Sequence, residues 1–170
     1  GYLKNVFYDN LCVFIFLLTS FQLTTAEDNL KPFKTDVPPI IDGNLNDQLW
    51  KDALSVYGFK TFAPDLGKDG TESTIAYAAY DSENLYFAFR CFDKEPGKIK
   101  SSVSSRDNIR PDDWVCINLD SFNDQQSLYA VYVNPLGIQM DSRFASGQED
   151  ISADFVWYSG GQKLSDGYSI

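Results

Sequence analysis

The chain has 170 residues, a length that fits a single domain. Its net charge of −10 disfavours nucleic acid and anionic membrane surfaces as partners, because an acidic protein surface repels phosphate groups. The chain contains no histidine, which excludes Ser-His-Asp and Cys-His nucleophile systems and any histidine-ligated zinc site. Oxygen-ligated ions such as calcium remain compatible with this composition. Aromatic residues make up 15% of the chain, enough to fill a core between sheets or to line a ligand-binding face.

The first 26 residues are predicted to be a secretory signal peptide. Lys4 precedes an apolar run of 11 residues from Leu11 to Phe21, and small residues ending at Ala26 follow it. A positive start, an apolar stretch and a small-residue cleavage site are typical of such signals. A buried core helix is the alternative, which the polar, proline-containing stretch after Ala26 disfavours. We therefore expect an exported protein of the periplasm, the outer membrane or the extracellular space. The run is too short for a transmembrane helix, which needs roughly 20 apolar residues, so no transmembrane span is expected in this segment.

The next part of the chain is expected to lead into the folded domain. Residues 27–39 are polar and contain prolines, which predicts an extended lead-in. Residues 40–43 indicate a short strand that ends in a turn, and residues 44–53 indicate a short helix. In that helix Leu49 and Trp50 share an apolar face with Leu45, so we expect the helix to pack on a sheet with Trp50 as a core anchor.

From residue 73 onward the pattern is that of β-strands separated by turns. The first two runs read as a hairpin, because Asp81–Asn84 between them is rich in turn-forming residues. The predicted strands are Ser73–Tyr80, Leu85–Phe92, Trp114–Asp120, Leu128–Asn134, Ile138–Phe144 and Ala153–Tyr158. Frequent strands with only one helix predict an all-β fold: an antiparallel β-sandwich, jelly-roll or immunoglobulin-like, with one short N-terminal helix.

Two cysteines, Cys91 and Cys116, follow the predicted signal peptide. Export permits a disulfide between them. Both also lie in apolar, strand-like runs, where a free cysteine behaves as a small buried hydrophobic residue. The sequence leaves both states open.

Several motifs in the chain resemble one known family. The Ile-Ile-Asp-Gly turn at residues 40–43, followed by Trp50 and Ala53, resembles the opening of family 9 carbohydrate-binding modules, and residues 81–93 resemble the second signature of that family. The domain is thus similar to family 9 carbohydrate-binding modules, which are DOMON-like, and a more specific subgroup is indicated by further motifs in the same order: Arg106-Asp107, Asp112–Val115, Leu119-Asp120, Asn134–Gly137 and Gln139–Asp141. That subgroup is found at the N-terminus of large exported bacterial proteins with a β-barrel-like C-terminal region.

The resemblance implies that residues 40–170 form a β-sandwich module, truncated at its C-terminus before a final strand. It implies a non-catalytic carbohydrate-binding module, with no catalytic residues, in an exported protein linked to polysaccharide breakdown or uptake. The implied partner is a poly- or oligosaccharide, and the implied cofactor is a structural calcium ion. In sugar-binding members the positions of Arg110 and Cys116 hold tryptophan and glutamate. A structural or interaction domain that has lost the sugar site is therefore the alternative, and a glycoside hydrolase-associated domain is a third.

The best candidate for a sugar-stacking side chain is Trp114, because the apolar C–H face of a sugar ring packs well on indole. Its polar neighbours are expected to bond the sugar hydroxyls. The predicted carbohydrate-binding residues are Arg106, Arg110, Asp112, Asp113 and Trp114. The alternative for Trp114 is a second core face that it shares with Cys116.

A calcium site is predicted at one polar turn. Asp120, Asn123 and Asp124 place three oxygen-bearing side chains close together, and calcium prefers such ligands. The alternative is that these side chains only stabilise the turn by bonding to nearby backbone groups.

Overall fold

The computed structural model describes residues 31–170. The predicted signal peptide lies outside the described residues. Within the described part of the chain, no helix has the length and apolar character needed to cross a bilayer.

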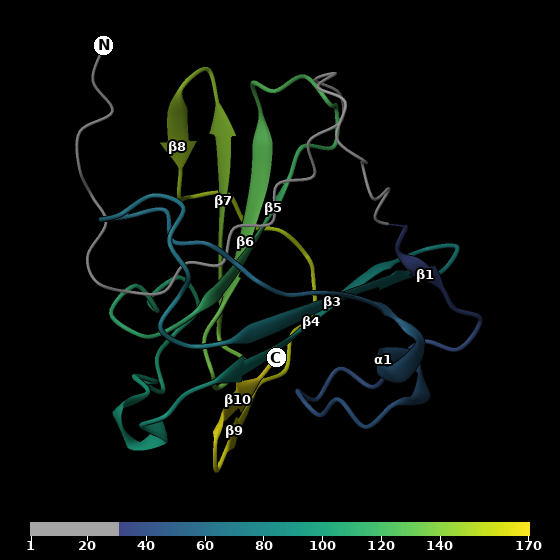
Figure 1. Cartoon of the computed structure of the whole chain (residues 1–170). Helices are drawn as coiled ribbons and strands as arrows, with labels where there is room; N and C mark the ends of the chain where they lie inside the picture. The colour runs from purple at the N-terminus through teal and green to yellow at the C-terminus, as the bar shows by residue number, and fades with distance from the viewer. Residues whose placement is uncertain (1–30) are drawn as a thin grey trace.

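The described chain folds into two packed β-sheets (Figure 1). Sheet 1 has the order β1-β3-β4-β10-β9, with β2 also paired to β3, and sheet 2 has the order β5-β6-β7-β8. The strands of sheet 1 are β1 (Phe33–Lys34), β2 (Leu54–Val56), β3 (Thr74–Tyr80), β4 (Leu85–Phe92), β9 (Gln162–Leu164) and β10 (Gly167–Ser169). Those of sheet 2 are β5 (Val115–Leu119), β6 (Leu128–Val133), β7 (Gln139–Ala145) and β8 (Gln148–Asp150). All strand pairs are antiparallel except β1 with β3.

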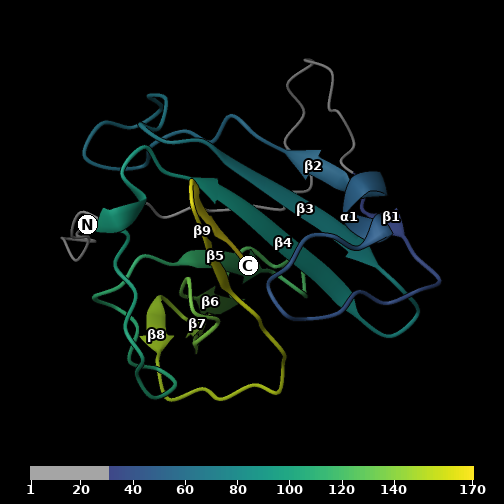
Figure 2. The ribbon, with the colours of Figure 1, turned by 90° about the horizontal axis from the view of Figure 1, so that it is seen from below.

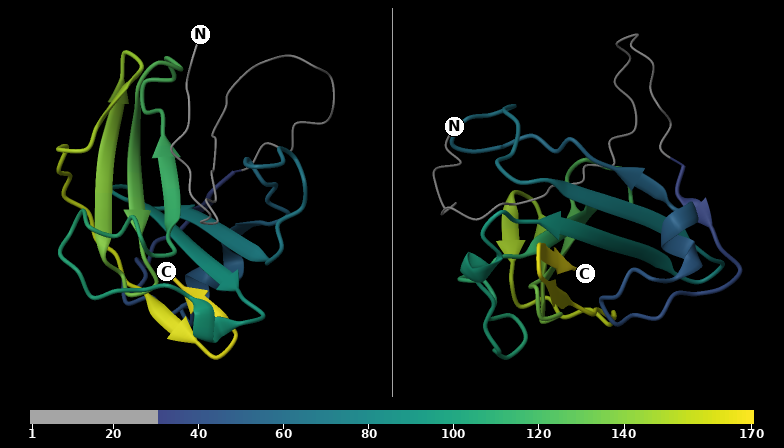
Figure 3. Two further views of the ribbon diagram at one scale, coloured as in Figure 1. Left: turned by 90° about the vertical axis from the view of Figure 1, so that its left-hand side faces the viewer. Right: turned by 60° about the horizontal axis from the view of Figure 1, so that its bottom comes forward.

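The two sheets cross each other. In Figure 1, β5, β6 and β7 run up the page while β3 and β4 cross them obliquely, and the left view of Figure 3 shows the same crossing from the side. β10 pairs with residues 90–92 at the carboxyl-terminal end of β4, and Figure 2 shows the short helix α1 (Gln48–Asp52) near the other end of β4. A 3-10 turn, η1 (Pro96–Lys98), follows β4. The structure thus confirms the predicted all-β sandwich with one short helix.

Each face of sheet 1 carries its own core, because alternate residues of β4 point to opposite sides. Phe89 and Cys91 face sheet 2 and pack in the main core with Val115 and Ile117 of β5. Tyr86 and Ala88 face the other way, into a cluster that includes Leu49 and Trp50 of α1. The aromatic and small side chains of the hairpin therefore serve two layers, and the apolar stripe of α1 anchors it as predicted.

The β3–β4 hairpin forms where the sequence predicts it. Tyr80 lies opposite Leu85 in the ladder. In the turn between them, Asp81 Oδ1 accepts the backbone N–H groups of Glu83 and Asn84, both at 2.7 Å. A second oxygen of Asp81 accepts the Tyr86 hydroxyl at 2.5 Å. The side chain of Asp81 therefore fixes this turn.

Two predicted strands are wrong. Residues 40–43 form a turn, in which Asn44 N–H bonds Asp42 Oδ1 at 2.7 Å and Gly43 has a φ of +82°. Residues 153–158 belong to no strand. The backbone groups of Phe155 and the Trp157 carbonyl bond to side chains, as described below, and not to a neighbouring strand. The predicted helix is also shorter than residues 44–53, because its first residues belong to the turn.

The predicted lead-in contributes to the sandwich. Phe33 and Lys34 pair with Ala79 and Tyr80 of β3, and Thr35 N–H bonds the Tyr80 carbonyl at 2.8 Å. A strand of only two paired residues is too short to produce an alternating pattern, so the sequence gives no sign of it. The fold therefore uses residues on both sides of the predicted boundary at residue 40.

Cys91 and Cys116 are both buried, and they form no disulfide with each other. Cys91 packs in the core between the sheets. Cys116 alternates with Val115 and Ile117, so it lies on the opposite face of sheet 2. Sheet 2 itself separates the two sulfur atoms, which settles the state that the sequence leaves open.

Candidate functional site

The five predicted sugar-binding residues lie on the long connection between η1 and β5. Its two ends are tied together: Lys100 N–H donates to Asp113 Oδ2 at 2.9 Å, and Asp113 N–H donates to the Lys100 carbonyl at 3.0 Å. Half-burial raises the pKa of Asp113, although its bond with Lys100 acts in the other direction. Asp113 therefore closes the base of the loop.

Asp112 is a buried structural acid. Its carboxylate accepts the Ser102 backbone N–H at 3.0 Å, the Ser102 hydroxyl at 2.6 Å and the Asn134 amide at 2.9 Å. Burial opposes the charge of Asp112, but the bonds from Ser102 and Asn134 outweigh it and lower its pKa. Asn134 follows β6, so these bonds fasten the loop to the end of sheet 2.

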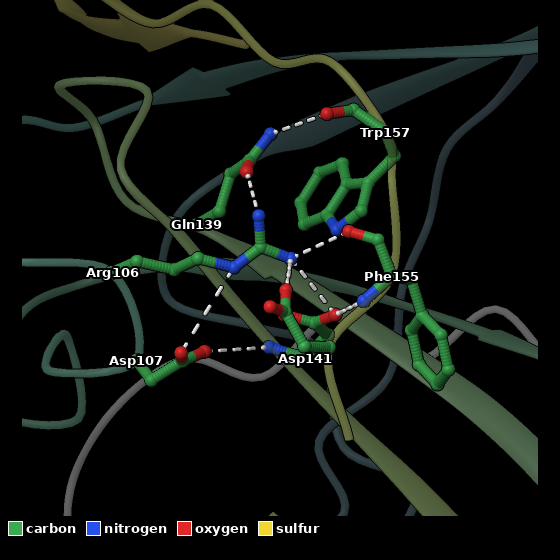
Figure 4. Close-up of polar contacts among 7 residues, drawn as sticks. Arg106, Asp107, Gln139, Asp141, Phe155 and Trp157 are labelled. Carbon is green, nitrogen blue, oxygen red and sulfur yellow. Dashed lines mark hydrogen bonds and ion pairs between the residues drawn. The ribbon is translucent and has the colours of Figure 1, made fainter. Parts of the chain in front are cut away.

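Arg106 is the centre of a second polar network (Figure 4). Its Nη2 lies 2.8 and 3.0 Å from the two oxygens of Asp141, which is fully buried on β7. Nη2 also donates to the Phe155 carbonyl at 2.7 Å, and Nη1 donates to Gln139 Oε1 at 2.9 Å. Asp141 accepts the Phe155 N–H at 2.6 Å, and Gln139 Nε2 donates to the Trp157 carbonyl at 3.0 Å.

This network holds two segments against β7. The loop that carries Arg106 is one, and Asp107 joins it to the strand by donating its N–H to the Gln139 carbonyl at 2.9 Å. The segment at residues 153–158 is the other. The N–H and C=O groups of Phe155 in this segment bond to Asp141 and Arg106 in place of a strand partner. An exposed carboxylate, Asp154, adds an ion pair to Arg106 at 3.0 Å.

Arg110 and Trp114 lie on the face of sheet 2 that is turned away from sheet 1. Trp114, just before β5, meets the ring of Tyr132 edge-on, with ring centroids 5.1 Å apart. Tyr132 pairs with Cys116, which is on that face. Arg110 Nη2 lies 3.6 Å from Glu149 Oε1, and Glu149 pairs with Phe144 on the same face. We call Arg110, Trp114, Tyr132 and Glu149 the Trp114 patch.

The Trp114 patch combines aromatic and charged groups of differing exposure. The side chain of Arg110 is 55% exposed and that of Glu149 is 28% exposed. Burial raises the pKa of Tyr132, so its hydroxyl stays protonated and can donate a hydrogen bond. Arg110 donates hydrogen bonds and Glu149 accepts them. The Trp114 patch therefore presents aromatic rings, hydrogen-bond donors and an acceptor on one face of sheet 2.

The structure thus divides the predicted residues. Arg110 and Trp114 lie on the same face of sheet 2, each with its own partner there, whereas Arg106, Asp112 and Asp113 bond to other parts of the protein. The sequence analysis did not single out Tyr132 and Glu149. The alternation along β6 could have indicated Tyr132, because this residue lies between the core residues Val131 and Val133 and so points to the opposite face of the sheet. Glu149 has no such signal, since β8 is short and exposed.

The predicted calcium turn is stabilised by its own backbone. Asp120 accepts the N–H groups of Asp124 at 3.2 Å and Gln125 at 2.8 Å. Asp124 accepts those of Gln126 and Ser127 and the Ser127 hydroxyl, all within 2.9 Å. Within residues 31–170 no three His, Cys, Asp or Glu side chains gather as a metal site. This geometry accounts for both carboxylates without an ion, and calcium binding at Asp120, Asn123 and Asp124 stays a prediction.

The fold and the patch together define an all-β sandwich with an aromatic and charged face. Comparisons with protein-family models, with curated proteins and with solved structures found no match. Membership of the carbohydrate-binding module family therefore stays a prediction that depends on the sequence motifs.

Proposed function

We propose that this protein is a non-catalytic carbohydrate-binding module of an exported protein, and that it binds a poly- or oligosaccharide at the Trp114 patch. The observation that carries the proposal is that the Trp114–Tyr132 ring pair and the Arg110–Glu149 ion pair lie on the same face of sheet 2, where the charge of Glu149 contributes to the raised pKa of Tyr132. Rings offer an apolar surface to sugar C–H groups. The charged pair offers donors and an acceptor to sugar hydroxyls.

The two polar networks of the loop support this proposal. Asp112 fastens one end of the loop to Asn134, and Arg106 fastens its middle to Asp141. Arg110 lies between these anchors. A binding side chain that is held in place before the ligand arrives loses less conformational entropy on binding. The predicted residues that do not reach the patch therefore contribute to binding by holding Arg110.

The test is a glycan array followed by titration calorimetry on the full chain. For a saccharide that binds, we expect Trp114→Ala and Arg110→Ala each to weaken binding at least tenfold. Arg143→Ala is the matched control, because Arg143 is an exposed arginine of the same sheet whose guanidinium lies over the Tyr129 ring, on the face opposite the patch. Circular dichroism would show that each variant is folded. The proposal fails if no saccharide binds the folded protein, or if Arg143→Ala weakens binding as much as the patch variants do.

A further inference from the structure

The connection between β2 and β3 contains a short hairpin at residues 60–69, which we call the 60–69 hairpin. Lys60 and Asp69 form an isolated antiparallel bridge at its base. Next to this bridge, the Thr61 N–H donates to the Lys68 carbonyl at 2.8 Å. Figure 2 shows the connection between β2 and β3 extending past the end of sheet 1 at which β3 begins. The hairpin therefore projects from the sandwich.

The tip of the 60–69 hairpin is apolar and exposed. Leu66 is 77% exposed and Phe62 is 61% exposed. Ala63 and Pro64, which lie between them in the chain, are exposed as well. Single exposed apolar residues are common on protein surfaces, but here four of five consecutive residues are apolar and exposed. A concentrated apolar surface of this kind indicates a site of interaction.

The tip is held in place by bonds within the hairpin and by its base. Phe59, just before the hairpin, packs against the main core between the sheets. The Thr61 hydroxyl donates to the Asp65 carbonyl, and the Gly67 N–H donates to the Thr61 carbonyl at 2.8 Å. These bonds already satisfy part of the backbone of the tip, which lowers the cost of moving it out of water. A surface that is ordered beforehand also loses less conformational entropy on binding.

The charges of the hairpin balance one another. Residues 60–69 contain two lysines and two aspartates. Lys60 pairs with Asp69, and Lys68 Nζ lies 2.7 Å from Asp65 Oδ2. An electrically neutral hairpin has no reason to prefer a charged partner. The net charge of −10 on the whole chain repels an anionic lipid surface, whereas a zwitterionic surface carries no net charge.

The size of the tip favours lipid over a protein partner. A standard protein interface buries about 800 Å² on each partner. A large apolar side chain buries at most about 150–250 Å². Phe62 and Leu66 together therefore offer well under the area that a stable protein complex or a dimer needs. A lipid layer surrounds an inserted tip on all sides, so a few apolar side chains suffice for reversible binding.

We propose that the 60–69 hairpin inserts its tip, with Phe62 and Leu66, into the surface of a zwitterionic lipid bilayer. Lys60 and Lys68 then lie at the level of the lipid headgroups, because a lysine can bury its methylene stem and keep its ammonium group in water. The inserted tip orients the sandwich on the membrane. This inference concerns the connection between β2 and β3 and does not depend on saccharide binding at the Trp114 patch.

The experiment mixes the full chain with phosphatidylcholine vesicles and measures binding by co-sedimentation. Every protein carries Phe14→Asp and Leu17→Asp, because the apolar run of the predicted signal peptide would itself bind lipid. The test variants are Phe62→Asp and Leu66→Asp. The matched control is Phe122→Asp, since Phe122 is a phenylalanine of similar exposure, 69%, on the turn between β5 and β6. Circular dichroism checks that each protein is folded.

We expect Phe62→Asp and Leu66→Asp each to weaken vesicle binding at least tenfold, and Phe122→Asp to change it less than threefold. Leu66→Trp reports insertion directly: brominated phosphatidylcholine should quench its fluorescence more strongly than that of the parent chain. Addition of an anionic lipid at low salt should weaken binding, because the chain is acidic.

Several results would overturn the inference. One is a folded protein that does not bind phosphatidylcholine vesicles. Another is a loss of binding in Phe122→Asp as large as that in the tip variants. Binding that rises with the content of anionic lipid would contradict the charge argument and overturn the choice of a zwitterionic surface. A dimer of the free protein that Leu66→Asp dissociates would assign the tip to a second copy of the chain instead.

Discussion

Replacement of Asp141 by alanine removes the centre of the network that joins β7 to the loop and to the 153–158 segment. In the native protein the Asp141 carboxylate is fully buried and accepts bonds from Arg106 and from the Phe155 N–H. The variant leaves the Arg106 guanidinium without its main partner and leaves the Phe155 N–H without an acceptor. Both effects destabilise the folded state, because buried polar groups without partners lose the bonds that water supplies in the unfolded chain.

The size of the stability loss in Asp141→Ala follows from the burial of this carboxylate. Breaking a buried ion pair by removal of one partner costs about 3–5 kcal/mol. The Arg106 side chain is 34% exposed and retains its bonds to Gln139 and the Phe155 carbonyl, which places the expected loss at the low end. We therefore expect the free energy of unfolding to fall by about 3 kcal/mol. For a domain of this size such a loss lowers the melting temperature by roughly 10 °C.

Urea unfolding followed by tryptophan fluorescence measures this loss. The matched control is Asp154→Ala, which removes another carboxylate from the same arginine. The Asp154 side chain lies 3.0 Å from Arg106 but is 76% exposed, so its removal should cost under about 1 kcal/mol. Equal losses for the two variants, or a loss under about 1 kcal/mol for Asp141→Ala, would show that burial does not govern this pair.

Three further predictions concern other parts of the fold. The Tyr86 hydroxyl and nearby backbone N–H groups lower the pKa of Asp81 to about 2, from its ordinary 3.8. Asp81 therefore adds stability above pH 4 that is lost as the pH falls toward 2. Urea unfolding should show that Asp81→Asn loses less free energy of unfolding across that pH range than the parent chain does. Gly167→Ala should lower the free energy of unfolding by about 3 kcal/mol, because a Cβ there would lie 2.0 Å from the Cys91 carbonyl oxygen. Gly97→Ala is the control and should lower it by under about 1 kcal/mol in the same assay, because a Cβ at Gly97 would have no neighbour within 4 Å. Burial raises the pKa of Cys91 to about 11, so a thiol reagent at pH 7 should label it only after unfolding, as mass spectrometry of its peptide would report.

Sequence patterns predict the parts of this fold that local signals determine. The β3–β4 hairpin has two apolar runs and a turn headed by Asp81, whose side chain bonds within the turn. The helix that carries Leu49 and Trp50 has an apolar stripe at helical spacing. In both cases the residues that fix the structure lie within a few positions of each other, so the sequence shows them directly.

The error at residues 153–158 has a long-range cause. Phe155 and Trp157 alternate with smaller residues as in a strand, and the Phe155 ring does meet the Tyr129 ring edge-on, with centroids 5.3 Å apart. The backbone partners of this segment are the side chains of Asp141, 14 residues earlier, and Arg106, 49 residues earlier. Local pattern carries no information about such bonds. Strand-like alternation indicated that the segment packs against the sandwich but did not indicate that side chains bond the backbone of Phe155 and the Trp157 carbonyl.

The candidate site shows the same division. Charged residues next to a tryptophan suggested ligand binding, yet a charged residue inside a protein needs partners whether or not a ligand binds. Asp112 bonds to Ser102 and Asn134, and Arg106 bonds to Asp141. In each case the partner lies far away in the chain. Residue type alone does not separate a charge that holds a loop from a charge that contacts a ligand. Only the folded structure shows that Arg110 and Trp114 belong to the patch and that the other predicted residues do not.

The Arg106 network also bears on the proposed saccharide site. Arg106 lies on the loop that carries Arg110, and its bonds to Asp141 and to the Phe155 carbonyl hold that loop against the rest of the domain. Loss of Asp141 should therefore weaken saccharide binding at the Trp114 patch, because Arg110 would no longer be held in place before the ligand arrives. Titration calorimetry of the folded Asp141→Ala variant measures this effect. If Asp141→Ala lowers stability but leaves the saccharide affinity of the folded fraction unchanged, the network supports the fold alone and does not position the patch.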